Sequence, residues 1–292
     1  MRYEGDLYSP HIQGDDYILQ CTIGCSHNKC TFCYMYKNKQ YRVRQLHEIL
    51  EDIDAAKEYY GDVTKVFLAD GDALNMPIEN LLAIVDYLYN TFTGLQYIGT
   101  YATAASILAK TPAELTQLKD HGLVEVHLGV ESGDEEVLRT IRKGVSRAEM
   151  VEAASQIRQA GLQLFVTVIL GLAGSKTNLW AHAKHTAQIC NELQPDYIGL
   201  LTIMVQPGTE LYETMRSGQF SAPEDMEILE EMYIMIEAMR LEHTGITSVH
   251  PSNCIDLEGL LPADKDRILQ TLSRIIQNKD ISCLRSRKTE RV

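Results

Sequence analysis

The sequence contains no run of eighteen apolar residues, and its first seventeen residues are polar and acidic. A transmembrane segment and a secretory signal are therefore both missing, which predicts a cytoplasmic protein with no membrane partner. Basic residues are also few, since 27 Lys and Arg stand against 40 Asp and Glu, a formal net charge of −13. Such a surface repels phosphate backbones, so a dedicated nucleic-acid binder is disfavoured.

Apolar β-branched runs alternate with amphipathic stretches along the chain, a pattern typical of βαβ crossovers with buried parallel strands. Strands are predicted at residues 17–22, 65–69, 96–100, 124–130, 162–170 and 197–205, with a shorter one at 246–249. Helices are predicted at 44–60, 78–92, 135–142, 147–160, 179–193, 223–240 and 263–277, and after Thr111 and Pro112. Six strand–helix units are too few for a complete eight-fold barrel. The expected fold is therefore α/β, a partial (β/α)6 barrel with its site at the carboxyl ends of the strands.

The same pattern predicts how the chain is divided. Residues 1–245 would form the barrel, and residues 246–292 would form a short C-terminal extension that packs on the barrel mouth. The chain ends in a basic tail with Arg285, Arg287, Lys288 and Arg291, which we expect to be a solvated, frayed end.

Cysteine is the most informative residue type. Four of the seven cysteines, Cys21, Cys25, Cys30 and Cys33, fall within thirteen residues. In a chain without a secretory signal, clustered cysteines favour metal or redox chemistry over disulfides. Three thiolates on one loop, two of them separated by two residues, can hold an iron–sulfur cluster. The alternative is a zinc-stabilised, non-enzymatic binding protein with His27 or Cys21 as fourth ligand, but no second pair of ligands is evident.

The segment CTIGCSHNKCTFCYMY at residues 21–36 resembles the radical S-adenosylmethionine (radical SAM) superfamily. Its usual signature is C-x3-C-x2-C with an aromatic residue just before the last cysteine. Cys30, Phe32 and Cys33 match the paired arm, while Cys25 precedes Cys30 by four intervening residues instead of three. A register that begins at Cys21 loses the paired arm. The resemblance therefore implies Cys25, Cys30 and Cys33 as cluster ligands, with Phe32 beside the cofactor and Cys21 on the strand face.

Two further motifs resemble the same superfamily. ADGDAL at residues 69–74 is similar to its G-G-E-P turn, which implies that Asp72 accepts hydrogen bonds from the ammonium of S-adenosylmethionine. HLGVESGD at 127–134, followed by EEVLRTIRKG, resembles the branch that includes oxygen-independent coproporphyrinogen oxidases. That likeness implies that Glu131 contacts the cofactor ribose and Lys143 pairs with the cofactor carboxylate. Without the resemblance, Asp70 and Asp72 would be turn formers, and Glu131 and Lys143 solvated helix charges.

A fourth motif, TVILGLAG at residues 167–174, resembles the G-x-I-x-G pattern whose backbone lies against adenine. It implies cofactor contacts by Thr167, Ile169 and Gly171. Glycine at positions 171 and 174 permits a close approach of the backbone.

The resemblance implies two cofactors, a [4Fe–4S] cluster and S-adenosylmethionine. The amino and carboxylate groups of S-adenosylmethionine would chelate the iron that has no protein ligand. One electron, from a donor such as flavodoxin or ferredoxin, would then cleave it, and the 5′-deoxyadenosyl radical would abstract hydrogen from the substrate. Such an enzyme is expected to need anaerobic handling.

The substrate is less well indicated than the cofactors. Candidate catalytic residues are the polar side chains at predicted strand ends and in the C-terminal segment: Tyr101, His127, Thr202, His250 and Asn253. The acidic balance and the short extension favour a small polar molecule over nucleic acid. The overall build resembles the queuine lyases, so a lyase acting on a deazapurine base is one hypothesis. Modification of tRNA or of a peptide is the alternative.

Overall fold

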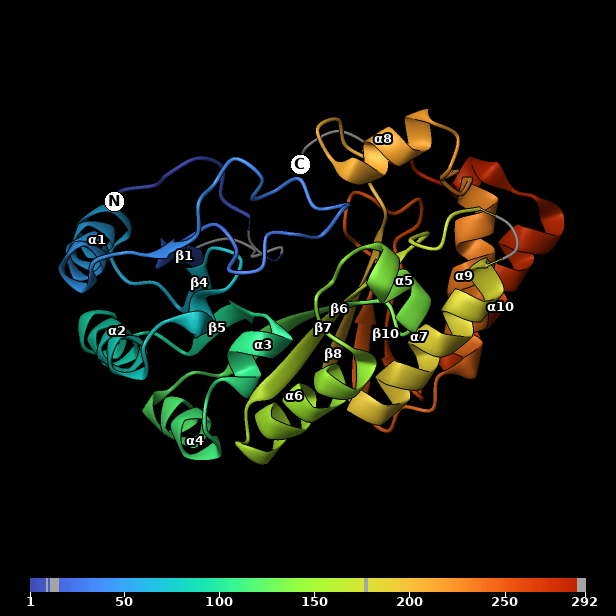
Figure 1. Cartoon of the computed structure of the whole chain (residues 1–292). Helices are drawn as coiled ribbons and strands as arrows, with labels where there is room; N and C mark the ends of the chain where they lie inside the picture. The colour runs from blue at the N-terminus through green and yellow to red at the C-terminus, as the bar shows by residue number, and fades with distance from the viewer. Residues whose placement is uncertain (9, 11–15, 176–177, 288–292) are drawn as a thin grey trace. The chain divides into compact units, whose positions relative to one another are not determined.

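The computed structural model describes residues 1–8, 10, 16–175 and 178–287, and the fold is α/β (Figure 1). Its strands are β1 (Asp16–Gln20), β2 (Thr22–Ile23), β3 (Arg42–Val43), β4 (Lys65–Ala69), β5 (Tyr97–Ala102), β6 (Glu125–Glu131), β7 (Gln163–Leu170), β8 (Tyr197–Thr202), β9 (Thr244–Thr247) and β10 (Glu258–Leu261). Its α-helices are α1 (Leu46–Tyr60), α2 (Ile78–Thr91), α3 (Ala104–Leu108), α4 (Pro112–His121), α5 (Glu135–Thr140), α6 (Arg147–Gln159), α7 (Leu179–Leu193), α8 (Glu210–Arg216), α9 (Asp225–Ala238) and α10 (Lys265–Asn278). Short 3₁₀ turns are η1 (Ala73–Asn75) and η2 (Ile281–Cys283).

Eight strands form one sheet in the order β1-β4-β5-β6-β7-β8-β9-β10. In this sheet β1–β4, β4–β5, β5–β6, β7–β8 and β8–β9 pair in parallel, whereas β9 and β10 pair antiparallel. Strands β4 and β6 are buried along nearly their whole length, as expected where helices cover parallel strands. The predicted α/β class is confirmed, and the mostly parallel sheet is the one expected of a partial (β/α) barrel.

Two compact units make up the chain. The first comprises Met1–Asn28, Met35–Leu128 and Glu152–Leu164, and the second Lys29–Tyr34, Gly129–Val151 and Phe165–Val292. In the first, α1 packs on β1 and α2, and α2 packs on α4 (Figure 1). In the second, α9 lies between α7 and α10 (Figure 1). Within the described residues, no helix combines the length and apolar character needed to cross a bilayer.

Local signals in the sequence explain most helix boundaries. Thr111 caps α4 with a reciprocal capping box to Glu114, and Pro112 occupies the first turn. Helix α1 buries Ile49 and Ile53 at helical spacing and ends at Gly61, whose φ is 76°. Propensity and capping alone therefore suffice to place these two helices.

The structure differs from the predicted elements in four places. The predicted strand 17–22 is split into β1 and β2, and β2 pairs with β3 instead of extending the large sheet. Helices α3 and α8 and strand β10 were not predicted. All three are seven residues or fewer, too short to show a period in the sequence.

The prediction of a solvated, frayed basic tail is wrong for its described residues. Arg285 donates to the carbonyl oxygens of Asn253 at 2.8 Å, Val249 at 2.9 Å and His250 at 2.5 Å, and pairs with Asp256 at 2.7 Å. Arg287 donates to the carbonyl oxygen of Pro223 at 3.2 Å. Several carbonyls converging on one guanidinium hold the tail against its own unit. Lys288 and Arg291 lie outside the described residues.

Replacing Arg285 by alanine should lower the free energy of unfolding by about 1.5–3 kcal/mol, the scale of hydrogen bonds to a charged donor. Urea denaturation monitored by circular dichroism measures the change. Arg216→Ala, at an exposed site at the end of α8, is the matched control and should shift stability by about 0.5 kcal/mol or less. Equal effects of the two substitutions would contradict the anchoring role of Arg285.

Candidate functional site

Burial divides six of the seven cysteines into two groups, and the seventh, Cys283, is exposed. Cys21, Cys190 and Cys254 are buried, whereas Cys25, Cys30 and Cys33 are only half-buried. Desolvation raises the pKa of the Cys21 thiol, and it raises the pKa of Cys254 to about 11. Because thiolates are the metal-binding form, the half-buried group has the better chemistry for a cluster. The donor set therefore fits an iron–sulfur cluster in the register that omits Cys21.

The cysteine loop belongs to both units. Cys25 is in the first unit, while Cys30, Phe32 and Cys33 are in the second. In the second unit the loop tip is fixed by its backbone: Thr31 N donates to Ile141 O at 2.9 Å, and Leu211 N donates to Thr31 O at 3.0 Å. Within the described residues, no three His, Cys, Asp or Glu side chains converge as a metal site.

Asp72 is fully buried in the first unit and surrounded by donors. Its carboxylate accepts from Thr103 N at 3.0 Å, Thr103 Oγ1 at 3.2 Å and Ser106 Oγ at 2.6 Å, and from the Ser26 hydroxyl. Thr103 and Ser106 form the capping box of α3, so Asp72 ties the turn after β4 to the start of that helix. The ammonium contact predicted for Asp72 would be an addition to this structural role.

Glu131 and Lys143 form an ion pair in the second unit. Lys143 Nζ lies 2.8 Å from Glu131 Oε1, and both side chains are largely buried. Glu131 ends β6 with a φ of 63°, an uncommon conformation for a residue other than glycine. A side chain at position 129 would place its Cβ 2.2 Å from Glu131 Oε1 and 3.0 Å from Lys143 Nζ, so Gly129 leaves room for the pair. The twelve-residue spacing thus brings together the two groups that the motif predicted.

Strand β7 and the turn after it carry the other predicted cofactor residues. Thr167 is half-buried, Ile169 is nearly buried, and Gly171 has a φ of 82°. Gly171 N donates to Glu231 Oε2 at 2.8 Å, and Glu231 also bonds to the His182 ring. His182 and Glu231 are both buried, and no partner of His182 Nε2 occurs within the part of the chain described. Glu231 of α9 therefore fixes the backbone of this turn at Gly171.

Tyr101 and His127 lie together in the first unit. His127 packs edge-on against Phe67, with ring centroids 5.0 Å apart, and against Tyr101 at 5.9 Å. Its Nε2 is 2.5 Å from Glu125 Oε1, which also accepts from Tyr97 Oη at 2.5 Å. Desolvation by burial raises the pKa of Tyr101. Polar groups inside an aromatic wall are suited to a planar polar ligand.

Thr202, His250 and Asn253 lie together in the second unit. Thr202 Oγ1 donates to Asn253 Oδ1 at 2.8 Å, and Asn253 Nδ2 donates to the carbonyls of Leu200 at 2.7 Å and Ser248 at 2.8 Å. Asn253 is fully buried, so these bonds join the C-terminal segment to β8. His250 is half-buried, with Nδ1 2.8 Å from Ser252 Oγ. Of the three side chains, His250 is the one nearest to solvent.

Three buried acidic residues were missed by the sequence analysis as parts of a network: Glu125, Glu231 and Asp70. Glu231 lies on the buried, methionine-rich side of α9, and the helix contains no Lys or Arg that could pair with it. A buried acid in such a position indicates a partner on another element. Asp70 was considered only as a turn residue. No local pattern identifies its partner Lys39, which is 31 residues away.

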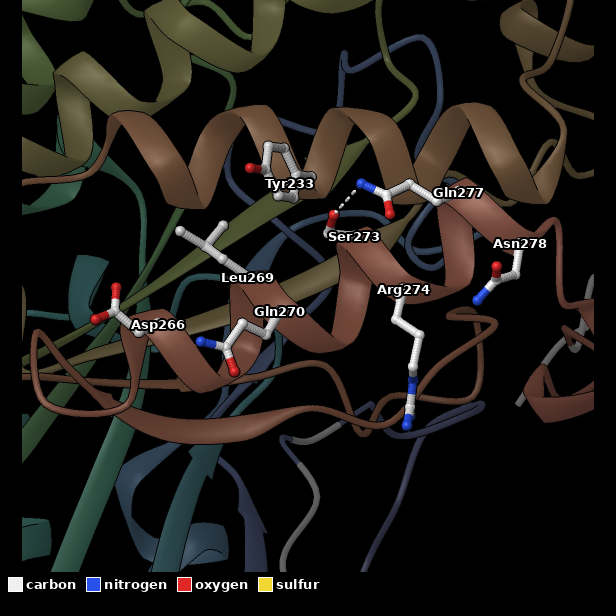
Figure 2. A pocket seen from close by; sticks show the side chains of 8 residues that line it. All are labelled: Tyr233, Asp266, Leu269, Gln270, Ser273, Arg274, Gln277 and Asn278. Atoms are coloured by element: carbon white, nitrogen blue, oxygen red, sulfur yellow. Dashed lines mark hydrogen bonds between the residues drawn. The ribbon is translucent and has the colours of Figure 1, made fainter.

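A groove of about 380 Å³ lies along α9 and α10 in the second unit (Figure 2). Tyr233, Arg274 and Gln277 are among the side chains that line it, and Gln277 bonds to Ser273. None of the predicted site residues borders this groove. It is therefore separate from the cysteine loop and from the β6 and β7 motifs.

Known proteins resemble this chain at low identity. The heme chaperone HemW of Bacillus subtilis (strain 168) is 21% identical over 199 residues, which cover 68% of this chain and 51% of HemW. A tRNA uridine(34) acetyltransferase of Methanocaldococcus infernus is 26% identical over 117 residues, covering 40% of this chain and 22% of that protein. This chain therefore matches about half of HemW and less of the acetyltransferase.

The structure of Escherichia coli coproporphyrinogen III oxidase (HemN), described as a radical SAM enzyme, superposes with a TM-score of 0.59 at 17% identity. The superposition covers 76% of this chain and 52% of HemN, and at this identity it shows a shared fold. Together with HemW, it supports the resemblance to the coproporphyrinogen oxidase-like branch.

The radical SAM superfamily pattern matches residues 19–185, more than half of the chain. That match contains the half-buried cysteines, the turn after β4, the Glu131–Lys143 pair and the turn after β7. Its members use a [4Fe–4S] cluster and S-adenosylmethionine, which the donor set of the cysteine loop fits. On these grounds the chain belongs to the radical SAM superfamily.

Proposed function

We propose that this protein is a radical SAM enzyme whose cluster is held by Cys25, Cys30 and Cys33. The observation that carries the assignment is burial: these three thiols of one loop are half-buried, whereas Cys21 is enclosed and its pKa is raised. When bound, the cluster supplies the electron that cleaves S-adenosylmethionine to methionine and a 5′-deoxyadenosyl radical. Flavodoxin or ferredoxin would be a suitable donor of that electron.

The residues of this chain bind and orient the cofactor. Lys143 would pair with the carboxylate of S-adenosylmethionine, and Glu131, its present partner, would accept from the ribose hydroxyls. Thr167 would contact the ribose, while the backbone at Ile169 and Gly171 would lie along the adenine. Asp72 would add an acceptor for the ammonium, and Phe32 would shield the loop from water.

We propose a small polar substrate, planar in shape, with His127 and Tyr101 of the first unit as candidate contacts. His250 of the second unit is a separate candidate. Support comes from the edge-on packing of His127 and Tyr101 with Phe67 and from the accessible ring of His250. Thr202 and Asn253 would shape the site by holding the C-terminal segment. A deazapurine such as queuine, cleaved in a lyase reaction, belongs to this class. The relatives described above lend no support to queuine itself.

Modification of tRNA is the second candidate function. It is favoured by the similarity to the tRNA uridine(34) acetyltransferase and opposed by the net charge of −13. Arg285 and Arg287, the basic residues in the described part of the tail, already bond to their own unit. The small-molecule reading therefore has more support from the chain itself.

The first test of the proposal is the ligand set. Cys25→Ala, Cys30→Ala and Cys33→Ala should each abolish cluster binding and the formation of 5′-deoxyadenosine, because each removes one protein ligand. Iron analysis and absorption spectra of anaerobically reconstituted protein measure this. Cys21→Ala is the control and should retain both properties. Iron lost in Cys21→Ala and kept in Cys25→Ala would show that the register is wrong.

Lys143→Ala should weaken S-adenosylmethionine binding by about 1.5–3 kcal/mol, as expected for a lost charge-assisted hydrogen bond. Titration calorimetry on cluster-loaded protein under anaerobic conditions gives the affinity. Arg139→Ala serves as the control, because Arg139 is an exposed cation of α5 paired with Glu136. An affinity unchanged in Lys143→Ala would leave the lysine as a purely structural partner of Glu131.

The substrate class is tested by what stimulates 5′-deoxyadenosine formation. A panel of polar nitrogen heterocycles that includes queuine should contain a stimulating compound, whereas unmodified tRNA should have no effect. His127→Gln and His250→Ala should lower the stimulated rate more than the substrate-free rate, and exposed His243→Ala should match the wild type. Stimulation by tRNA that requires Arg285 and the residues after it would instead establish the second candidate function.

A further inference from the structure

The carboxylate of Asp70 is a buried junction at the end of β4. Its Oδ2 accepts from Gly24 N at 2.9 Å, Lys39 Nζ at 2.9 Å and Gln20 Nε2 at 3.0 Å. Asp70 is fully buried, and the Lys39 side chain is only 10% exposed. In the resembling G-G-E-P turn, a glycine occupies the position of Asp70. The junction is therefore a property of this chain's own sequence.

These bonds join the two ends of the cysteine loop. Gly24 immediately precedes Cys25, and Lys39 follows the last cysteine of the loop by six residues. Asn28 adds a second tie, since its Nδ2 donates to Tyr36 O at 2.7 Å and to Lys39 O at 3.2 Å. The side chains of Asp70 and Asn28 thus hold together the segments that enter and leave the cysteine loop.

Gly71 shows how closely the loop is held. A Cβ at this position would lie 2.5 Å from the Tyr36 ring and 3.1 Å from Cys25 Cβ. Gly71 N also donates to Gly24 O at 3.2 Å. The loop ends are therefore packed against the turn after β4 with no space for a side chain.

Asp70 and Lys39 carry opposite charges, and each compensates for the burial of the other. Asp70 Oδ1 is buried and has no hydrogen-bond partner within the described ranges, and Lys39 supplies a positive charge 2.9 Å from Oδ2. Removing one partner of a buried pair leaves the other charge uncompensated, which costs more than the pair contributes. Neutralising Lys39 should therefore release the loop ends, although the surrounding sheet is unchanged.

We propose that Asp70 and Lys39 are positioning residues that clamp both ends of the cysteine loop, so that the loop is ordered before the cluster enters. The proposal rests on the assignment of Cys25, Cys30 and Cys33 as ligands. The clamp slows the escape of iron by keeping Cys25 near its place whenever a ligand bond opens.

Two measurements test the clamp on full-length protein. Hydrogen exchange of cluster-free protein should be roughly tenfold faster over residues 22–40 in Lys39→Met and Asp70→Asn than in the wild type. After anaerobic reconstitution, both variants should release iron to excess chelator roughly tenfold faster, and their reduced clusters should show a heterogeneous EPR spectrum. Lys39→Arg keeps the charge and should restore slow iron release.

The matched control is Asp52→Asn, which breaks another buried pair of the first unit, Asp52–Arg44 at 2.8 Å, from a position on α1. It should lower thermal stability without altering iron release or the exchange of residues 22–40. Wild-type rates of exchange and of iron release in both Lys39→Met and Asp70→Asn would overturn the clamp. An equally large increase of iron release in Asp52→Asn would overturn it as well. Hydrogen exchange is measured on iron-free protein, so its result does not depend on which cysteines bind the cluster. If Cys25→Ala still binds iron, the ligand assignment fails, but the exchange rates still test the clamp.

Discussion

Backbone pairing that continues beyond two parallel strands positions the start of the cysteine loop. Strands β1 and β4 end at the pair Gln20–Ala69, yet Cys21 N donates to Ala69 O at 2.6 Å and Asp70 N to Thr22 O at 3.2 Å. The segment after β1 therefore stays paired with the segment after β4 for at least two more residues. This pairing places Cys25 beside Gly71 and buries Cys21. It also brings the carboxylate of Asp70 within hydrogen-bond distance of Gly24 at the start of the loop.

Buried charges are placed at the carboxyl ends of strands in both units. Asp70 follows β4, Glu131 ends β6, and Glu231 of α9 holds the backbone of Gly171 after β7. In each case the carboxylate bonds to groups that fix a turn. Because an uncompensated buried carboxylate is costly, each network favours a single arrangement of its turn. Preorganised turns of this kind are what a reactive cofactor requires, since water must be kept from it.

Sequence reasoning succeeded where the signal was local or where a whole motif was present. The buried strand at Lys65–Ala69 and the capping residues Thr111 and Pro112 were predicted from neighbouring residues alone. The motif singled out Glu131 and Lys143 as cofactor contacts, but it did not predict that they pair with each other. Helix α3 was not predicted, because its five residues are too few to show a helical period. Its tie to Asp72, 31 residues before Thr103, has no local signal either. The buried Asp70 and Glu231 look like exposed acids in sequence, since their partners are distant along the chain.

We propose that the half-buried cysteines hold a cluster with one iron open to S-adenosylmethionine. EPR spectroscopy of the anaerobically reduced protein, recorded with and without S-adenosylmethionine, tests this proposal most directly. We expect the signal of a reduced [4Fe–4S] cluster whose g-values shift when S-adenosylmethionine is added. A colourless protein that contains zinc, or a cluster signal that saturating S-adenosylmethionine leaves unchanged, would contradict it.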